Sequence, residues 1–130
     1  MVGCTIGGMI SHLGINRTDM ERAGEFYDRT LAVLGHRRLL DHGVAIGYGT
    51  TSPDFWIGTF DGIGPNREVH VAFSAADATT VDAWFAEAVA CGAEVLHEPR
   101  FWPEYHEGYY GAFVRDPDGN NVEACCAVAT

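Results

Sequence analysis

Hydrophobic and polar residues alternate along the chain with two different periods, which predict strands and helices in a repeated order. Alternation at every second position is typical of a half-buried strand, whereas apolar residues spaced three or four apart are typical of a helix on a core. The predicted strands are about Met9–Arg17, Arg37–His42, Val44–Gly49, Asp54–Phe60, Glu68–Ser74, Ala93–Pro99, Tyr109–Arg115 and Asn120–Val128, and the predicted helices are Met20–Leu34 and Asp77 to about Cys91.

The resulting order is β-α-β-β-β, twice, and the spacing of single residues repeats with it. His12 lies seven residues before Asp19, the candidate N-cap of the first helix, and His70 lies seven residues before Asp77, the candidate N-cap of the second. A glycine follows each predicted helix, as is usual at a helix C-terminus. We therefore predict one α+β domain over residues 1–130, with module 1 at about 9–60 and module 2 at about 68–128.

Composition and charge narrow the classes of function. The 130 residues are 47% hydrophobic and carry a net charge of −10, and none of the basic residues is a lysine. This acidity argues against a nucleic acid or an anionic membrane as partner, and the lack of lysine excludes Schiff-base chemistry. Four cysteines without C-x-x-C spacing predict free thiols, and the N-terminus lacks a basic segment, so we expect a cytoplasmic protein.

One carboxylate stands out near the C-terminus. The turn Asp116–Gly119 joins two strands, and Glu123 follows it among apolar neighbours. An unpaired buried charge costs several kcal/mol, so Glu123 requires a partner there. It is either a residue at the rim or beside an arginine, or a ligand of a cation.

The two repeated histidines supply the second alternative. Each one alone is compatible with a hydrogen-bonded residue of a buried strand. Together with Glu123, however, His12 and His70 form a set of two imidazoles and one carboxylate from three strands, which is typical of a metal site that keeps positions open for water, substrate or dioxygen. We expect the three side chains to converge on one ion at about 2.0–2.3 Å each.

These residues lie in segments by which the chain resembles the vicinal oxygen chelate superfamily of glyoxalases, bleomycin-resistance proteins, fosfomycin-inactivating transferases and extradiol dioxygenases. The segments are ISHLGIN, FYDRTLAVLGHRRL, VHVAFSA and GYYGAFVRDPDGNNVEACC. The resemblance implies paired βαβββ modules whose curved sheets form a cup. It also implies a divalent metal (Zn, Fe, Mn or Ni) held by His12, His70 and Glu123, and lyase, isomerase, transferase or dioxygenase chemistry on a small oxygen-chelating substrate.

The chain departs from glyoxalases in the last strand of module 1, where those enzymes place a further ligand. Here Trp56 or a direct neighbour takes the place that Glu123 has in module 2. Indole is not a metal ligand, so a three-ligand site is the expectation. The same substitution favours an alternative function, a metal-free protein of the bleomycin-resistance type that sequesters an aromatic antibiotic or metabolite.

Further candidates lie in the aromatic segment Phe101–Tyr110, which suits a wall or lid over a flat substrate, or a loop that covers the end of the sheet. His106 is a candidate general acid or base, and Tyr109 or Tyr110 a candidate donor to an oxyanion. The open strand edges would be covered by pairing of the modules within the chain or with a second copy, and we expect a homodimer. The full set of candidates is Glu123, His106 and Tyr110 as catalytic residues, Trp56, Trp102, Tyr105, Tyr109 and Arg115 for substrate, and His12, His70 and Glu123 for metal.

Overall fold

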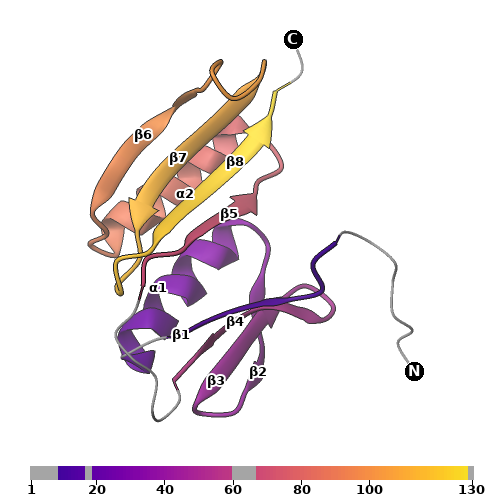
Figure 1. Ribbon diagram of the computed structural model, residues 1–130, viewed down its shortest axis with the longest axis vertical. Coiled ribbons are helices and arrows are strands. Elements are labelled where there is room, and N and C mark those ends of the chain that lie inside the picture. The colour runs from indigo at the N-terminus through magenta and orange to yellow at the C-terminus, as the bar shows by residue number, and fades with distance from the viewer. Residues whose placement is uncertain (1–8, 17–18, 60–66, 129–130) are drawn as a thin grey trace.

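Each half of the chain forms one helix and one four-stranded sheet, in the predicted order (Figure 1). The computed structural model describes residues 9–16, 19–59 and 67–128. Module 1 contains β1 (Leu13–Asn16), α1 (Met20–Val33), β2 (Arg37–Asp41), β3 (Ala45–Gly49) and β4 (Pro53–Gly58). Module 2 contains β5 (His70–Ser74), α2 (Ala78–Ala90), β6 (Val95–Phe101), β7 (Tyr109–Arg115) and β8 (Asn121–Ala127).

The two sheets have the same topology. Their strand orders are β1-β4-β3-β2 and β5-β8-β7-β6. In each sheet the first strand runs parallel to the last, and the remaining neighbours are antiparallel. The predicted α+β fold of two βαβββ modules is therefore confirmed.

Local signals explain where the helices begin and end. Asp19 accepts a hydrogen bond from the Arg22 N–H at 3.1 Å, and Asp77 accepts one from the Thr80 N–H at 2.8 Å, so both predicted N-caps are confirmed. Gly35 follows α1 with φ of 87°, the left-handed conformation that ends helices and that glycine adopts without strain.

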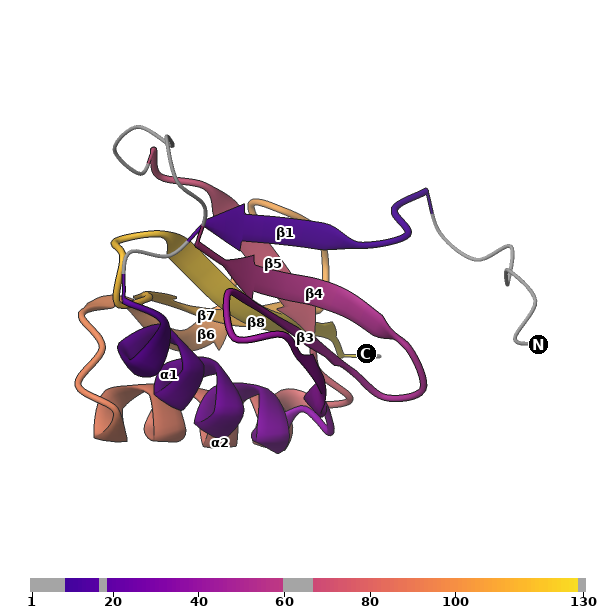
Figure 2. The ribbon, with the colours of Figure 1, turned by 90° about the horizontal axis from the view of Figure 1, so that it is seen from below.

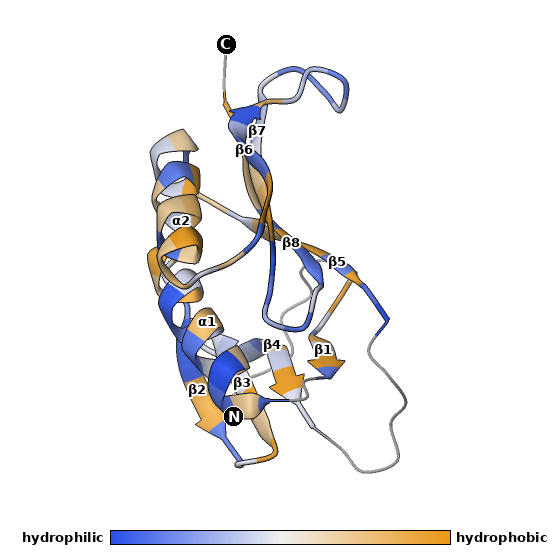
Figure 3. Ribbon diagram, turned by 90° about the vertical axis from the view of Figure 1, so that its left-hand side faces the viewer, coloured by the Kyte–Doolittle hydropathy of each residue, from blue (hydrophilic) through white to orange (hydrophobic). Residues whose placement is uncertain are grey.

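Both helices lie on the same side of the two sheets, so the molecule has a helical layer and a sheet layer (Figures 2 and 3). Apolar side chains from alternate strand positions fill the space between the layers. The buried core includes Tyr27, Leu31, Tyr48, Ile57, Val71, Val81, Trp84, Val114, Val122 and Ala124. The other face of each sheet is free of helices, and His70, Glu123 and Trp56 lie on it.

Contacts between the modules join α1 and β4 to module 2. The Tyr27 hydroxyl donates to Asp116 Oδ2 at 2.6 Å, and both residues are buried. The Phe55 and Phe73 rings meet edge to face with centroids 5.1 Å apart. The two helices also run side by side (Figure 2). None of the described helices combines the length and the apolar character that a membrane crossing requires.

Some predicted boundaries were wrong. β1 begins at Leu13 rather than Met9, because β4, its partner among the described strands, begins at Pro53, which has no N–H to donate. His12 therefore precedes the strand. β6 continues past Pro99 to Phe101, because β6 is an edge strand and its pairing with β7 shifts between His97 and Arg100, which accommodates the proline. The predicted ends Arg17 and Phe60 lie outside the described residues.

Candidate functional site

Alternate residues of β5, β7 and β8 form the helix-free face of module 2. On β5 and β8, Val71 and Val122 point into the core, which leaves His70 and Glu123 on the opposite face. Phe113 of β7 lies directly opposite Glu123 in the antiparallel register. The pairing of these three strands thus places an imidazole, a carboxylate and an aromatic ring on one face.

His70 and Glu123, two of the three predicted ligands, meet at this face. Their Nε2 and Oε1 atoms are 2.9 Å apart. Glu123 is only 2% exposed, whereas half of the His70 side chain is accessible to solvent. The imidazole stacks on Phe113 with the ring centroids 5.9 Å apart, which limits its rotation. The buried carboxylate is therefore reached from solvent past an exposed, oriented imidazole.

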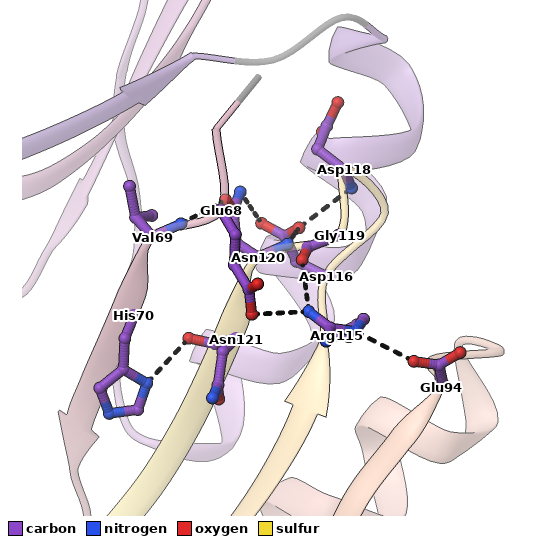
Figure 4. Close-up of polar contacts among 10 residues, drawn as sticks. All are labelled: Glu68, Val69, His70, Glu94, Arg115, Asp116, Asp118, Gly119, Asn120 and Asn121. Atoms are coloured by element: carbon purple, nitrogen blue, oxygen red, sulfur yellow. Dashed lines mark hydrogen bonds and ion pairs between the residues drawn. The ribbon is translucent and has the colours of Figure 1, made fainter. Parts of the chain in front are cut away.

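The other nitrogen of His70 also lies beside an oxygen that accepts hydrogen bonds. Nδ1 lies 3.2 Å from the Asn121 carbonyl oxygen (Figure 4). A carbonyl oxygen only accepts hydrogen bonds, so in the tautomer with the proton on Nδ1 a neutral imidazole presents the lone pair of Nε2 to Glu123. Two acceptor atoms at 2.9 Å repel each other unless a positive species, either a second proton or a metal ion, lies at Nε2.

The turn between β7 and β8 holds the start of β5 in place (Figure 4). Asn120 is fully buried and its side-chain NH₂ donates to Asp116 Oδ2 at 3.0 Å. Its Oδ1 accepts a hydrogen bond from the Val69 N–H at 3.0 Å, next to His70. The turn therefore positions the residue before β5 through a part-buried hydrogen bond.

Arg115, a predicted substrate-binding residue, belongs to this same corner of the molecule. Its guanidinium forms ion pairs with Glu68 at 2.7 Å and Glu94 at 3.0 Å, and it donates to the Gly119 carbonyl at 2.8 Å (Figure 4). The hydrogen bond to Glu68 is the main cause of the raised pKa of Arg115. The structure thus gives Arg115 partners within the protein, and two carboxylates balance its charge.

Tyr109 completes the surroundings of Glu123. Its hydroxyl donates to Glu123 Oε2, the carboxylate oxygen that does not face His70. Burial raises the pKa of Tyr109, and hydrogen bonds with Cys125 and Glu123 raise this pKa further. The hydroxyl therefore keeps its proton and acts as a donor at neutral pH.

Tyr110, the neighbouring candidate, points the other way. Its hydroxyl donates to Asp82 of α2 at 2.7 Å, and this bond is the main reason that the pKa of Tyr110 is raised to about 12. Since successive strand residues face opposite sides of the sheet, Tyr110 lies on the helical side. The structure therefore does not place the Tyr110 hydroxyl beside Glu123.

The aromatic segment mainly packs against itself. Trp102 is buried: Arg100 lies over its ring at 3.3 Å, Tyr105 stacks on it with centroids 5.4 Å apart, and its indole N–H donates to the Gly111 carbonyl. Tyr105 and His106 are exposed, and their rings lie 5.2 Å and 5.0 Å from that of Tyr109. This segment supports Tyr109 rather than presenting Trp102 to a ligand.

His12 and Trp56 lie in module 1, where they line a hollow of about 300 Å³. Gly14 pairs with Trp56 as Ala72 pairs with Glu123, two residues after His12 and His70 respectively, so Trp56 does take the place of Glu123. Across residues 9–16, 19–59 and 67–128, no three His, Cys, Asp or Glu side chains are grouped to hold a metal. The predicted convergence of His12 with His70 and Glu123 is therefore not found within this part of one chain.

Several residues that shape the site were not among the predicted ones. Phe113 orients His70, the Asn121 carbonyl lies beside its Nδ1, and His42 stacks on Trp56 with centroids 6.1 Å apart. The position of Asn121, directly after the turn and two residues before Glu123, was the available signal for its role. The contacts of Phe113 and His42 depend on the strand register and carry no such signal.

Comparisons with known proteins agree with this architecture. The family model of a glyoxalase-like domain matches residues 12–125. A glyoxalase/bleomycin resistance protein from Albidiferax ferrireducens T118 is similar in structure, with 28% identity, a TM-score of 0.83, and coverage of 92% of this chain and 99% of that one. A glyoxalase/bleomycin resistance protein/dioxygenase family enzyme from Burkholderia phytofirmans PsJN has 17% identity and a TM-score of 0.72, over 91% and 98% of the two chains.

A further solved structure, the lactoylglutathione lyase from Agrobacterium tumefaciens, has 22% identity and a TM-score of 0.68, over 94% of this chain and 96% of that one. At 17% and 22% identity, the Burkholderia and Agrobacterium structures support the fold alone. A search of curated proteins finds no match.

Proposed function

Because this chain belongs to the glyoxalase-like domain family of the vicinal oxygen chelate superfamily, we propose that it is a small metalloenzyme that binds one divalent ion at His70 and Glu123. Zn, Fe, Mn and Ni all suit a mixed imidazole and carboxylate site. When bound, the ion polarises adjacent oxygens of a small substrate or activates dioxygen, which covers the lyase, isomerase, transferase and dioxygenase reactions expected from the sequence.

The observation that carries the proposal is the contact between His70 Nε2 and Glu123 Oε1 at 2.9 Å. The Asn121 carbonyl lies on the Nδ1 side of the ring, and with the proton on Nδ1 the lone pair of Nε2 faces the carboxylate. Metal-bound histidines usually donate their other N–H in this way to a carbonyl or carboxylate. The donor set therefore fits a divalent cation, which would also balance the charge of the buried Glu123.

Two donors from one chain are fewer than a stable site needs, and we propose that a homodimer supplies the third. His12 is exposed, and it lies beside β1, which forms one edge of the sheet of module 1. Met9, Ile10 and Leu13 next to it are exposed large apolar residues, which a second copy would cover. In such a dimer, His12 of the partner subunit joins His70 and Glu123.

Proton transfer in this site is assigned to His106. Its Nδ1 lies 2.9 Å from the Glu107 carbonyl oxygen, so Nδ1 carries the proton and Nε2 is free to accept one. The side chain is exposed beside Tyr109, in the segment that borders Glu123. His106 is thus the candidate base that removes a proton from a substrate held at the metal.

A second function is favoured by one observation in module 1. Trp56 and His42 stack with ring planes 8° apart beside the hollow of about 300 Å³. A flat aromatic compound would extend this stack without any metal, as a sequestering protein requires. In that case the positive species between His70 and Glu123 is a proton.

A metal titration decides between the two functions. We expect Glu123→Gln to lower the affinity for Zn²⁺ or Mn²⁺ at least tenfold, because it removes the anionic ligand at almost constant volume. Glu98→Gln is the matched control, since Glu98 is an exposed residue of β6. Unchanged metal binding in Glu123→Gln, together with loss of aromatic ligands in Trp56→Ala, would establish the sequestering function instead.

A further inference from the structure

The two oxygens of the Glu123 carboxylate have different partners. Oε1 faces His70 Nε2 at 2.9 Å, and Oε2 accepts the hydrogen bond of the Tyr109 hydroxyl. Glu123 is 2% exposed, so water does not compete freely for either oxygen. The orientation of the carboxylate plane is therefore determined by the protein, and one oxygen is occupied before any ion arrives.

The position of Tyr109 is itself well determined. A Cβ atom on Gly111 would lie 3.2 Å from the ring of Tyr109 and 3.3 Å from Glu123 Oε2, so the absence of a side chain at this position makes room for the contact. On the other side, Tyr105 and His106 hold the ring edge to face, with centroids 5.2 Å and 5.0 Å away. A tyrosine packed against two rings is suited to orient a neighbour.

We infer that Tyr109 is a positioning residue that leaves Glu123 Oε1 alone to bind the metal, so that the carboxylate is a monodentate ligand. This inference rests on the proposed function of His70 and Glu123. Carboxylate ligands are commonly held by hydrogen bonds of this kind, and their loss costs about 10–100-fold in metal affinity. Monodentate binding also keeps one more coordination position open for the substrate.

This role differs from the one predicted from the sequence, in which Tyr109 contacts the substrate. A hydroxyl has one proton to donate, and in the structure that proton is directed at Glu123. The aromatic segment then acts on the metal site through Tyr109, since Tyr105 and His106 determine where its ring lies.

The test compares Tyr109→Phe with Tyr110→Phe, titrated with Co²⁺ and followed by visible absorption. The two variants lose the same atom at adjacent residues, but the Tyr110 hydroxyl binds Asp82 on the helical side. We expect Tyr109→Phe to bind Co²⁺ about tenfold or more weakly than wild type. We also expect its absorption bands to weaken, because a freed Oε2 raises the coordination number. Tyr110→Phe should match wild type in affinity and spectrum.

Each other result has a distinct meaning. If wild type and Glu123→Gln bind Co²⁺ equally, the proposed function and this inference both fail. If Co²⁺ binding by wild type depends on Glu123 but Tyr109→Phe keeps wild-type affinity and spectrum, the inference alone fails. It also fails if Tyr109→Phe and Tyr110→Phe lose the same amount of Co²⁺ affinity. If Tyr109→Phe does not fold, Gly111→Ala replaces it, because its Cβ displaces the Tyr109 ring and Glu123 Oε2. Wild-type affinity and spectrum in that variant would also overturn the inference.

Discussion

The two modules share one topology but distribute large and small side chains in opposite ways on their helix-free faces. In module 1 the last strand carries Trp56, which lies opposite Gly47, and a Cβ on Gly47 would come within 2.8 Å of the indole. In module 2 the last strand carries Glu123, and the residue opposite is Phe113. The indole of Trp56 thus requires a residue without a side chain at position 47, whereas Phe113 and Glu123 lie opposite each other with both side chains present.

The difference between Trp56 and Glu123 gives the two modules different faces, one aromatic and one with a buried carboxylate. The indole of module 1 fills its own face and stacks with His42, so that face is suited to packing against flat surfaces. The carboxylate of module 2 is buried and brings a requirement for positive charge, which His70 alone meets only in its protonated form. Metal binding is therefore expected in module 2, with module 1 contributing His12 across a dimer.

The largest effect is expected from a test of whether His12 of module 1 and Glu123 of module 2 share one metal site across a dimer. His12→Ala and Glu123→Gln should each lower metal affinity by one to two orders of magnitude, because each removes a ligand. In a mixed dimer of the two variants, one site combines an intact His12 with an intact Glu123. We therefore expect the mixture to regain one high-affinity site per dimer, measured by titration after native mass spectrometry has verified heterodimers. Verified heterodimers without such a site would show that the modules do not share it.

A second prediction concerns the contact that joins the modules. Tyr27→Phe removes a hydroxyl that donates to the buried Asp116 at 2.6 Å, and it should lower the free energy of unfolding by about 1.5–3 kcal/mol, the range for hydrogen bonds to charged groups. Tyr48→Phe is the control within module 1, since its partner Asp28 is partly exposed. Urea denaturation measures both. An equal loss of unfolding free energy in the two variants would mean that the contact between the modules stabilises the protein no more than the contact within module 1.

Making module 1 resemble module 2 tests the comparison in the opposite direction. Trp56→Glu places a carboxylate at the position equivalent to Glu123, near His12. In the shared site it adds a fourth ligand, so metal affinity should rise by about tenfold, or 1.4 kcal/mol. Trp56→Gln has nearly the same shape without the charge and should leave affinity unchanged. Isothermal titration that gives equal affinities for the two variants would place residue 56 outside the site.

The smallest effect is expected at the helix N-termini, where the modules also differ. Asp77 accepts hydrogen bonds from both the hydroxyl and the N–H of Thr80, and these lower the pKa of its carboxyl. A lowered folded-state pKa stabilises the protein above the unfolded value of about 3.9, and this contribution disappears as the pH falls through the folded-state pKa. Asp77→Ala should therefore lower the thermal midpoint at pH 7, and the difference from wild type should shrink as the pH falls below about 3.9. Asp19 accepts a hydrogen bond from the Arg22 N–H, so Asp19→Ala should cost less.

The fold was predictable because local signals agree with the hydrophobic pattern. The N-caps Asp19 and Asp77 bound both helices, and the turn Asp116–Gly119 sets the pairing of β7 with β8. That turn also predicted where Glu123 lies. Strand ends were less predictable. Proline ends most strands, but Pro99 is tolerated because β6 is an edge strand.

The site was predictable in part. His70 and Glu123 lie on neighbouring parallel strands, so the repeat could bring them together. Whether Tyr109 or Tyr110 meets Glu123 depends on the register, because a shift by one residue exchanges the two faces of a strand. His12 lies in module 1. The spacing that makes it equivalent to His70 does not indicate whether it faces module 2 of its own chain or module 2 of a second chain.

Crystals soaked with Zn²⁺ and measured at the zinc absorption edge show directly whether His70 and Glu123 bind a metal ion. We expect an anomalous peak about 2.0–2.3 Å from both His70 Nε2 and Glu123 Oε1, with Oε2 still bound to the Tyr109 hydroxyl. Diffraction that shows no peak at this pair, with His70 and Glu123 still in direct contact, would contradict it.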